Sequence, residues 1–187
     1  MSIYISLLRG INVSGQKKVN MKELKALYES LNLRQVTTYI QSGNVVFSCA
    51  DKSQEQLSAI IEESIERYFS FHVPVLILPQ QTLDKALEQL PFRNISVAEQ
   101  GSQVILSFLS EAVTPEKSDT LKNDLTDAES IACSQHIVYL HCPNGYGKTK
   151  LSNTFLEKKL AVTATSRNLK TIVKLCEISA LIQNETM

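Results

Sequence analysis

The residues best suited to chemistry are cations and glycines that gather in two short segments of the chain. The segment from Arg9 to Lys18 reads RGINVSGQKK, and the segment from Cys142 to Lys150 reads CPNGYGKTK. Glycine allows backbone N–H groups to turn toward a bound group, while lysine and arginine supply positive charge. Both segments therefore favour binding of an anion such as a phosphate, a carboxylate or a nucleic-acid backbone.

The distribution of charge agrees with this interpretation. The net charge is zero, but residues 1–34 hold six basic and two acidic residues, and residues 143–174 hold seven basic and one acidic. Residues 51–129 hold fourteen acidic and six basic residues. Such asymmetry favours an anionic partner for both ends of the chain, although solvated helix faces would produce it as well.

Neither segment is an intact nucleotide-binding P-loop. That motif requires G-x-x-x-x-G-K-[ST], and the position of its first glycine is Cys142 in the segment that ends Gly147-Lys148-Thr149. The N-terminal segment has Gly10 and Gly15 at the right spacing, but Gln16 stands where the lysine belongs. We therefore interpret both as anion-binding loops and not as NTPase sites.

Other catalytic or metal-binding patterns are weak. Cys133, His136, His141 and Cys142 are close in sequence, but they fall on an expected hairpin where neighbouring side chains point to opposite faces. Their spacing matches no zinc motif, so we expect no metal. His72 has no serine or cysteine nucleophile pattern around it, and no pair of carboxylates suggests acid–base catalysis.

Hydrophobic periodicity and capping residues predict the elements that would position these loops. Strands are predicted at 3–8, 36–40, 45–48, 73–78, 104–109, 130–133, 137–141 and 162–165. Helices are predicted after Asn20, after Ser53, at 82–90, from Pro115, at 149–159 and at 169–182. The helix after Ser53 is expected to carry Leu57, Ile60, Ile61, Ile65 and Tyr68 on one face.

This order of elements occurs twice and predicts an α+β fold of two ferredoxin-like βαββαβ halves, each followed by an extra helix. We expect a first half at residues 1–90, a linker at 91–101, and a second half with the C-terminal helix at 102–187. No run of about 18 apolar residues occurs, so we expect no membrane span. The N-terminus is predicted to form a strand and not a signal peptide, and four cysteines without a C-x-x-C pair favour the cytoplasm.

The predicted topology groups the polar loops into two clusters, because right-handed crossovers fix which loops share an end of the sheet. The candidate ligand-binding residues of the first half are Arg9, Gly10, Asn12, Lys17, Lys18, Gln41, Ser42, Gly43 and Asn44. Those of the second half are Asn144, Gly145, Tyr146, Gly147, Lys148, Lys150, Ser166, Arg167, Asn168 and Lys170. Whether the two clusters share one cleft is left open.

Four segments resemble the domain-of-unknown-function family 1697, a group of uncharacterised, mostly bacterial cytoplasmic proteins. They read LLRGINVSG, TYIQSGNVVF, YLHCPNGYGKTKL and TATSRNLKTIVKL. The resemblance implies a ferredoxin-like α+β fold, and it supplies no activity, cofactor or catalytic residue. The matching positions include Arg9, Gly10, Asn12, the residues 41–44, Gly145, Gly147, Lys148, Lys150, Arg167 and Asn168. Leu169 stands where relatives often have an aromatic residue, which weakens the inference of a ligand that stacks there.

Three functions follow as hypotheses. The first is a protein that binds an anionic ligand, a nucleotide or nucleic acid, although the aromatic RNA-binding signature of RRM domains is absent. The second is an enzyme for a small phosphorylated or carboxylated metabolite, with Arg9, Lys148 and Arg167 as an anion clamp and Asn12, Ser42 or Tyr146 as orienting groups. The third is a non-catalytic module that forms a homodimer through exposed sheet edges. The sequence identifies no cofactor and does not decide whether the protein is an enzyme.

Overall fold

The structure is a computed structural model that describes residues 1–13 and 15–186. The chain divides into two compact units. Unit 1 comprises residues 1–85 together with the residues from Lys174 onward, and unit 2 comprises Ala86–Val173. Within the described residues, every helix is too short or too polar to cross a membrane.

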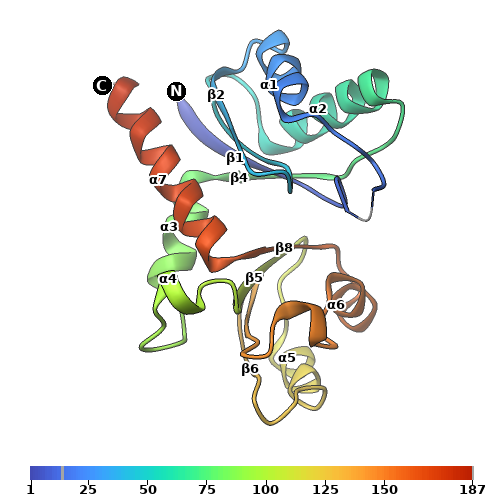
Figure 1. Cartoon of the computed structure of the whole chain (residues 1–187), viewed down its shortest axis with the longest axis vertical. Coiled ribbons are helices and arrows are strands. Elements are labelled where there is room, and N and C mark those ends of the chain that lie inside the picture. The colour runs from blue at the N-terminus through green and yellow to red at the C-terminus, as the bar shows by residue number, and fades with distance from the viewer. Residues whose placement is uncertain (14, 187) are drawn as a thin grey trace. The chain divides into compact units, whose positions relative to one another are not determined.

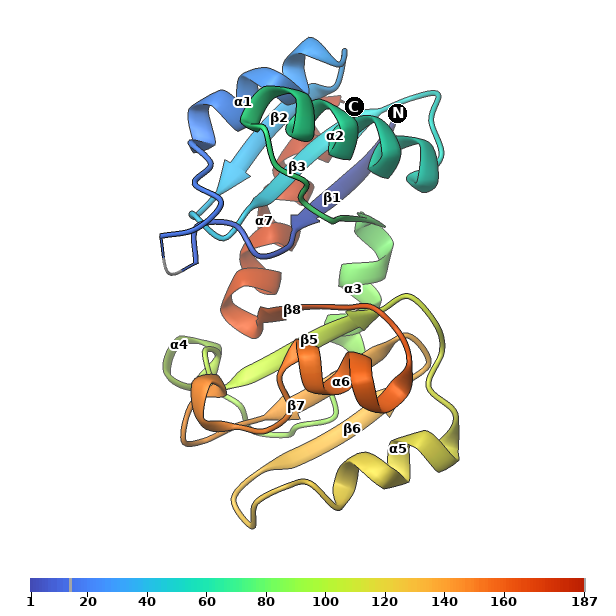
Figure 2. The same cartoon turned by 90° about the vertical axis from the view of Figure 1, so that its right-hand side faces the viewer.

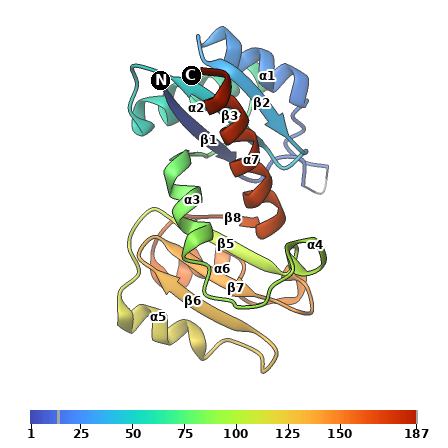
Figure 3. The same cartoon turned by 90° about the vertical axis from the view of Figure 1, so that its left-hand side faces the viewer.

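Unit 1 is built on a four-stranded antiparallel sheet with the strand order β2-β3-β1-β4. Its elements are β1 (Ser2–Leu8), α1 (Met21–Ser30), β2 (Arg34–Tyr39), β3 (Asn44–Cys49), α2 (Gln54–Phe69) and β4 (Val75–Pro79), followed by α3 (Gln80–Glu88). Helices α1 and α2 cover one face of this sheet, and the part of α7 from Lys174 onward lies across the other (Figure 1, Figure 3).

The helices of unit 1 begin where the sequence offers a cap. The Asn20 side chain accepts hydrogen bonds from the N–H groups of Lys22 and Glu23 at the start of α1. At the start of α2, Ser53 and Gln56 form a complete capping box. Both helices bury apolar stripes against β1, β3 and β4; the buried core includes Leu24, Leu27, Tyr28, Val45, Phe47, Leu57, Ile61, Ile65 and Ile77.

Unit 2 repeats the arrangement with the strand order β6-β7-β5-β8. Its elements are α4 (Val97–Gln100), β5 (Val104–Leu109), α5 (Pro115–Lys122), β6 (Ser130–Ser134), β7 (Ile137–His141), the 3-10 helix η1 (Tyr146–Lys148), α6 (Asn153–Leu160) and β8 (Ala164–Asn168); α7 (Leu169–Thr186) follows. Figure 2 shows α5 and α6 on one face of this sheet. The predicted fold class is confirmed: two ferredoxin-like halves, each followed by a helix.

Several predicted elements begin or end elsewhere. The helix predicted at 149–159 starts at Asn153, because Ser152 and not an earlier residue supplies the side-chain cap. The strand predicted at 162–165 runs from Ala164 to Asn168. Tyr68, predicted on the apolar face of α2, lies in the last turn of that helix, and 59% of its surface is exposed. The predicted linker contains α4, which the sequence did not indicate.

The compact units do not follow the predicted domains at the C-terminus, because the residues of α7 from Lys174 onward belong to unit 1. Helix α3 also crosses the boundary, which lies between Lys85 and Ala86. The division into domains of residues 1–90 and 102–187, with a linker at 91–101, remains a prediction about which segments fold independently.

The central strand of each sheet carries a buried serine at the same place. Ser6 of β1 lies opposite Ile77 of β4, and Ser107 of β5 lies opposite Ser166 of β8. Ser6 is fully buried and shares a hydrogen bond of 2.7 Å with the hydroxyl group of Tyr28, which is also fully buried. Burial raises the pKa of Tyr28 and keeps the phenol protonated.

The Ser6–Tyr28 pair gives a direct test of this core. Tyr28→Phe should lower the free energy of unfolding by about 1–3 kcal/mol, because the buried Ser6 hydroxyl loses its partner. The double variant Ser6→Ala with Tyr28→Phe should cost less than the sum of the two single changes, since no polar group is then left unpaired. Urea unfolding measures all three values; strictly additive losses would contradict the assigned pair.

Candidate functional site

The strand registers place the predicted loops at common ends of the two sheets. In unit 1, Leu7 of β1 pairs with Asn44 of β3, and Leu8 pairs with Val75 of β4. The loop after β1 and the β2–β3 turn therefore share an end, as predicted. We call Arg9–Lys18, without the undescribed Ser14, together with residues 41–44 the first loop cluster.

Asn12 holds the first loop cluster together. Its side-chain amide donates to the carbonyl oxygens of Val19 at 3.0 Å and Gln41 at 2.9 Å, and its Oδ1 accepts from the N–H of Val19 at 2.9 Å. Its backbone N–H donates to the carbonyl of Lys17, and its φ of 54° lies in the left-handed region that asparagine tolerates. These bonds give Asn12 a structural role.

Gly43 and Asn44 also serve the packing of this cluster. Gly43 has a φ of 76°, and a Cβ atom there would lie 2.6 Å from Cβ of Leu8 and 2.7 Å from Cδ1 of Ile11. Asn44 is fully buried, and its amide donates to the Tyr39 carbonyl and to the Ser42 hydroxyl. The close approach of the two loops is enough to explain why glycine stands at position 43 and asparagine at position 44, and no ligand is needed for that explanation.

One cation of the first loop cluster, Lys17, and the backbone of another, Arg9, are bonded within the protein. The Nζ of Lys17 donates to the carbonyl of His72 at 2.7 Å, and the backbone N–H of Arg9 donates to the carbonyl of Pro74 at 3.0 Å. Both bonds connect the loop after β1 to the segment that enters β4. Gly10 and Lys18 are exposed. The first loop cluster is thus a braced loop in which the side chains of Asn12, Lys17 and Asn44 have protein partners.

In unit 2, the loop after β7 and the end of β8 flank the start of β5. His141 pairs with Val104, Asn168 pairs with Ile105, and the N–H of Cys142 donates to the carbonyl of Gln103 at 2.8 Å. The prediction that the loop after β7 and the end of β8 lie at the same end of the sheet is confirmed. We call residues 144–150 and 166–170 the second loop cluster.

A network of side-chain hydrogen bonds ties the two parts of the second loop cluster together. The Ser166 hydroxyl donates to Oδ1 of Asn153 at the first residue of α6. Because that bond uses its only proton, Ser166 accepts from Ser107 at 2.6 Å and from the Tyr146 hydroxyl at 3.5 Å. Burial raises the pKa of Tyr146, so the phenol stays protonated and can donate.

The network gives Tyr146 a structural role, and a role in ligand binding remains a prediction. Its hydroxyl points inward to Ser166 and its ring packs on the core of unit 2, so Tyr146 anchors the loop. Ser107 and Asn153, which sequence reasoning did not select, complete the anchor. A serine inside the apolar strand VILSFL was the one available signal for Ser107; a buried polar side chain there requires a partner.

Arg167 and Asn168 lie at the end of β8. Arg167 is partly buried, and its Nη1 donates to the carbonyl of Ser166 at 2.9 Å. Burial lowers the pKa of Arg167 to about 10, so the guanidinium remains charged at neutral pH. The Oδ1 of Asn168 accepts from the N–H of Thr171 at 2.9 Å and caps the start of α7. Asn168 is thus structural, while Arg167 keeps a positive charge at this end of the sheet.

The outer part of the second loop cluster is open. Lys148 and Lys150 are exposed, and among the described residues no carboxylate forms an ion pair with either. Gly145 has a φ of 94°, and neither it nor Gly147 has an atom within 4 Å of the position that a Cβ would take. A ligand could therefore approach this backbone closely, beside the exposed Lys148 and Lys150.

Nucleophilic and metal chemistry find little support at this end. Burial raises the pKa of Cys142 to about 11, and burial also raises the pKa of Cys133, so both thiols are protonated at neutral pH. Cys142 lies in the core, whereas the His141 ring packs 5.7 Å from that of Phe92. Among the described residues, no group of three His, Cys, Asp or Glu side chains could hold a metal ion.

The comparisons with known proteins agree with this fold. The family of proteins of unknown function DUF1697 matches residues 1–139, and the chain belongs to that family. The conserved bacterial protein SP0830 from Streptococcus pneumoniae has a similar solved structure, with a TM-score of 0.65 and 26% identity over 95% of this chain and 98% of that one. A search of curated proteins gave no match. The family match ends before the second loop cluster, so the resemblance of its segments to the family remains a prediction.

The contrast between two glycines tests the packing of the first loop cluster. Gly10→Ala should cost about 1 kcal/mol of unfolding free energy, because its φ of 70° strains an alanine but space around it is free. Gly43→Ala should cost at least about 2 kcal/mol, because its Cβ must also displace Leu8 and Ile11. Chemical denaturation compares the two variants, and equal losses would refute the packing role of Gly43.

Proposed function

We propose that the protein binds an anionic, phosphate-bearing ligand, a nucleotide or nucleic acid, through the second loop cluster. The observation that carries the proposal is the pairing of exposed Lys148 and Lys150 with an open glycine loop anchored to β8 through Tyr146 and Ser166. Anchoring reduces the entropy that the loop would lose when a ligand binds. Arg167, at the end of the same strand, adds a cation at this end of the sheet.

The composition of the cluster favours recognition of charge over recognition of a base. Lysine interacts with phosphate as a mobile point charge, and the free space beside Gly145 and Gly147 lets a phosphate group approach the loop closely. Tyr146, the aromatic residue of this loop, turns inward, so a stacked base would find little support from it. We therefore assign the phosphate groups, and not the base, as the part of the ligand that the loop binds.

The second loop cluster is a stronger candidate than the first. In the first cluster Asn12, Lys17, Gly43 and Asn44 are engaged in internal bonds or close packing. In the second, the structural tasks fall mainly to Tyr146, Ser166 and Asn168. The side chains of Lys148 and Lys150 and the space beside Gly145 and Gly147 are left for a ligand, while the backbone N–H groups of Gly145 and Lys148 donate within the loop. We accordingly propose that Arg9, Gly10 and Ser42 contribute less to binding than Lys148 and Lys150.

We also propose a reducing, cytoplasmic location. All four cysteines, Cys49, Cys133, Cys142 and Cys176, are free thiols. Proteins exposed to an oxidising compartment commonly use their cysteines in disulfides, and those of a reducing compartment keep them as thiols.

Binding can be tested by thermal shift and titration with a nucleoside triphosphate and with short single-stranded RNA, at low and moderate salt. We expect a rise in melting temperature, because a ligand that binds only the folded state stabilises it by mass action. Lys148→Ala and Lys150→Ala should each weaken binding several-fold and, for RNA, reduce the dependence of log K on log salt by about 0.7 per lost phosphate contact.

Lys158→Ala is the matched control, because Lys158 is exposed on α6 outside the cluster and its loss changes the net charge equally. Arg167→Lys tests the guanidinium while the charge is kept. A response to the triphosphate alone would favour a small-molecule site, and a salt-dependent response to RNA would favour a polymer. Equal effects of Lys148→Ala and Lys158→Ala would refute the proposed site.

A further inference from the structure

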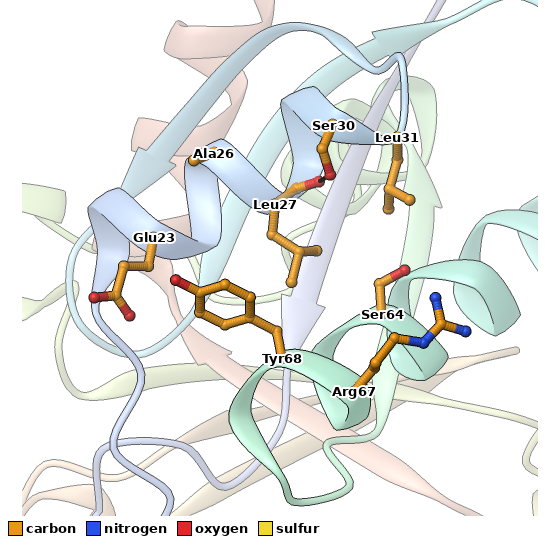
Figure 4. A pocket seen from close by; sticks show the side chains of 8 residues that line it. All are labelled: Glu23, Ala26, Leu27, Ser30, Leu31, Ser64, Arg67 and Tyr68. Atoms are coloured by element: carbon orange, nitrogen blue, oxygen red, sulfur yellow. Dashed lines mark hydrogen bonds between the residues drawn. The ribbon is translucent and has the colours of Figure 1, made fainter.

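A groove of about 420 Å³ lies between α1 and α2 on the outer side of unit 1. It is lined by Glu23, Ala26, Leu27, Ser30 and Leu31 from α1 and the residue that follows it, and by Ser64, Arg67 and Tyr68 from α2. Leu27 forms part of the floor, and Tyr68 projects from α2 with 59% of its surface exposed. Figure 4 shows the Tyr68 ring crossing toward α1 with its hydroxyl end near Glu23.

The two ends of the groove carry opposite charges. Glu23 stands at one end beside Tyr68, and the guanidinium of Arg67 points to the other end beside Ser64 (Figure 4). No salt bridge to Glu23 occurs among the described residues, while Arg67 pairs with Glu63 at 2.6 Å on an exposed surface. Exposed ion pairs contribute little to stability, so Arg67 can exchange this partner readily.

A carboxylate next to an exposed aromatic ring is a suitable site for a guanidinium group. The carboxylate forms a charge-assisted bidentate pair, and the ring face attracts the cation. The same groove presents a guanidinium, Arg67, at its opposite end. A two-fold axis through the groove would place Arg67 of each copy near Glu23 and Tyr68 of the other, because such an interface applies one patch to itself.

We infer that the groove between α1 and α2 is a docking surface for a second copy of this chain. In the resulting contact, Glu23 and Tyr68 of one copy receive Arg67 of the other, and Leu27, Leu31 and Ala26 form the apolar centre. Tyrosine and arginine are enriched in protein–protein interfaces and among the residues that contribute most to binding. In this symmetric contact, Glu23 of each copy pairs with Arg67 of the other copy.

The alternative route to a dimer through the edge of the sheet is poorly suited in unit 1. The edge strand β2 shifts register between Arg34 and Thr37, and Gln35 has a φ of 52°. Irregularities of this kind blunt a strand edge and oppose pairing with another strand. Pairing through the β2 edge is therefore disfavoured, and the helical face offers charge complementarity instead.

Sedimentation of the full chain over the micromolar range tests the inference. The wild-type protein should sediment as a concentration-dependent dimer. Glu23→Arg and Arg67→Glu should each weaken dimerisation at least about tenfold, because like charges then face each other across the axis. The double variant Glu23→Arg with Arg67→Glu should recover the dimer, since the opposite charges are restored with their places exchanged.

Lys25→Glu is the control on α1, because Lys25 lies outside this groove and pairs with Glu29. It should leave the dimer unchanged. Melting temperatures confirm that each variant folds, and recovery by the double variant cannot arise from misfolding, since it combines both changes. A protein that remains monomeric, or a dimer that the single reversals leave intact, would overturn the inference.

Discussion

The hydroxyl group of Ser166 joins three elements of unit 2 and fixes the shape of the proposed binding loop. It donates to Asn153 at the start of α6 and accepts from Ser107 in the central strand and from Tyr146 in the loop. These groups lie in a mostly apolar region, so leaving one of the hydroxyl groups unpaired would cost about 1–3 kcal/mol of folding free energy. The hydrogen bonds therefore favour one conformation of the loop strongly. Lys148 and the glycines depend on that arrangement for their positions, although they make none of these bonds.

In unit 1, different interactions hold the corresponding loop in place. Its buried Ser6 bonds to Tyr28 on a helix, and its loop is held from within by Asn12 and by the close approach of Gly43 to Leu8 and Ile11. The same topology thus yields one loop braced by Asn12 and Gly43, and one loop that is anchored through Tyr146 and leaves the side chains of Lys148 and Lys150 exposed. This difference is the physical reason to place the ligand of the proposed function in unit 2.

Local signals predicted much of the fold. Asn20 and Ser53 marked helix starts, the Gly43-Asn44 pair marked a turn, and the β5 and β7 boundaries matched their apolar runs. The start of α6 was predicted too early because Thr149 and Ser152 both resemble caps; the Thr149 hydroxyl instead accepts from the N–H of Leu151. Tyr68 follows the helical period of α2 but lies in its last turn, where the sequence cannot show whether a neighbour covers it.

The candidate site was predicted less completely. The residue types pointed to loops that the structure brings together at one end of each sheet, yet they could not separate residues that hold a loop from residues with exposed side chains. Asn12, Tyr146 and Asn168 were chosen as binding residues and turn out to be engaged in loop bracing or helix capping. That distinction depends on the pairing of Ser107 with Ser166, which are distant in sequence and adjacent only once β5 and β8 align.

The central claim is that the second loop cluster binds the phosphate groups of a ligand. The most direct measurement is a titration of isotope-labelled protein with a nucleoside triphosphate, followed by the amide NMR signals of both loop clusters. The account predicts saturable shifts at residues 144–150 and 167–170, with smaller changes at 9–18 and 41–44. Shifts confined to the first loop cluster, or none in either, would contradict it.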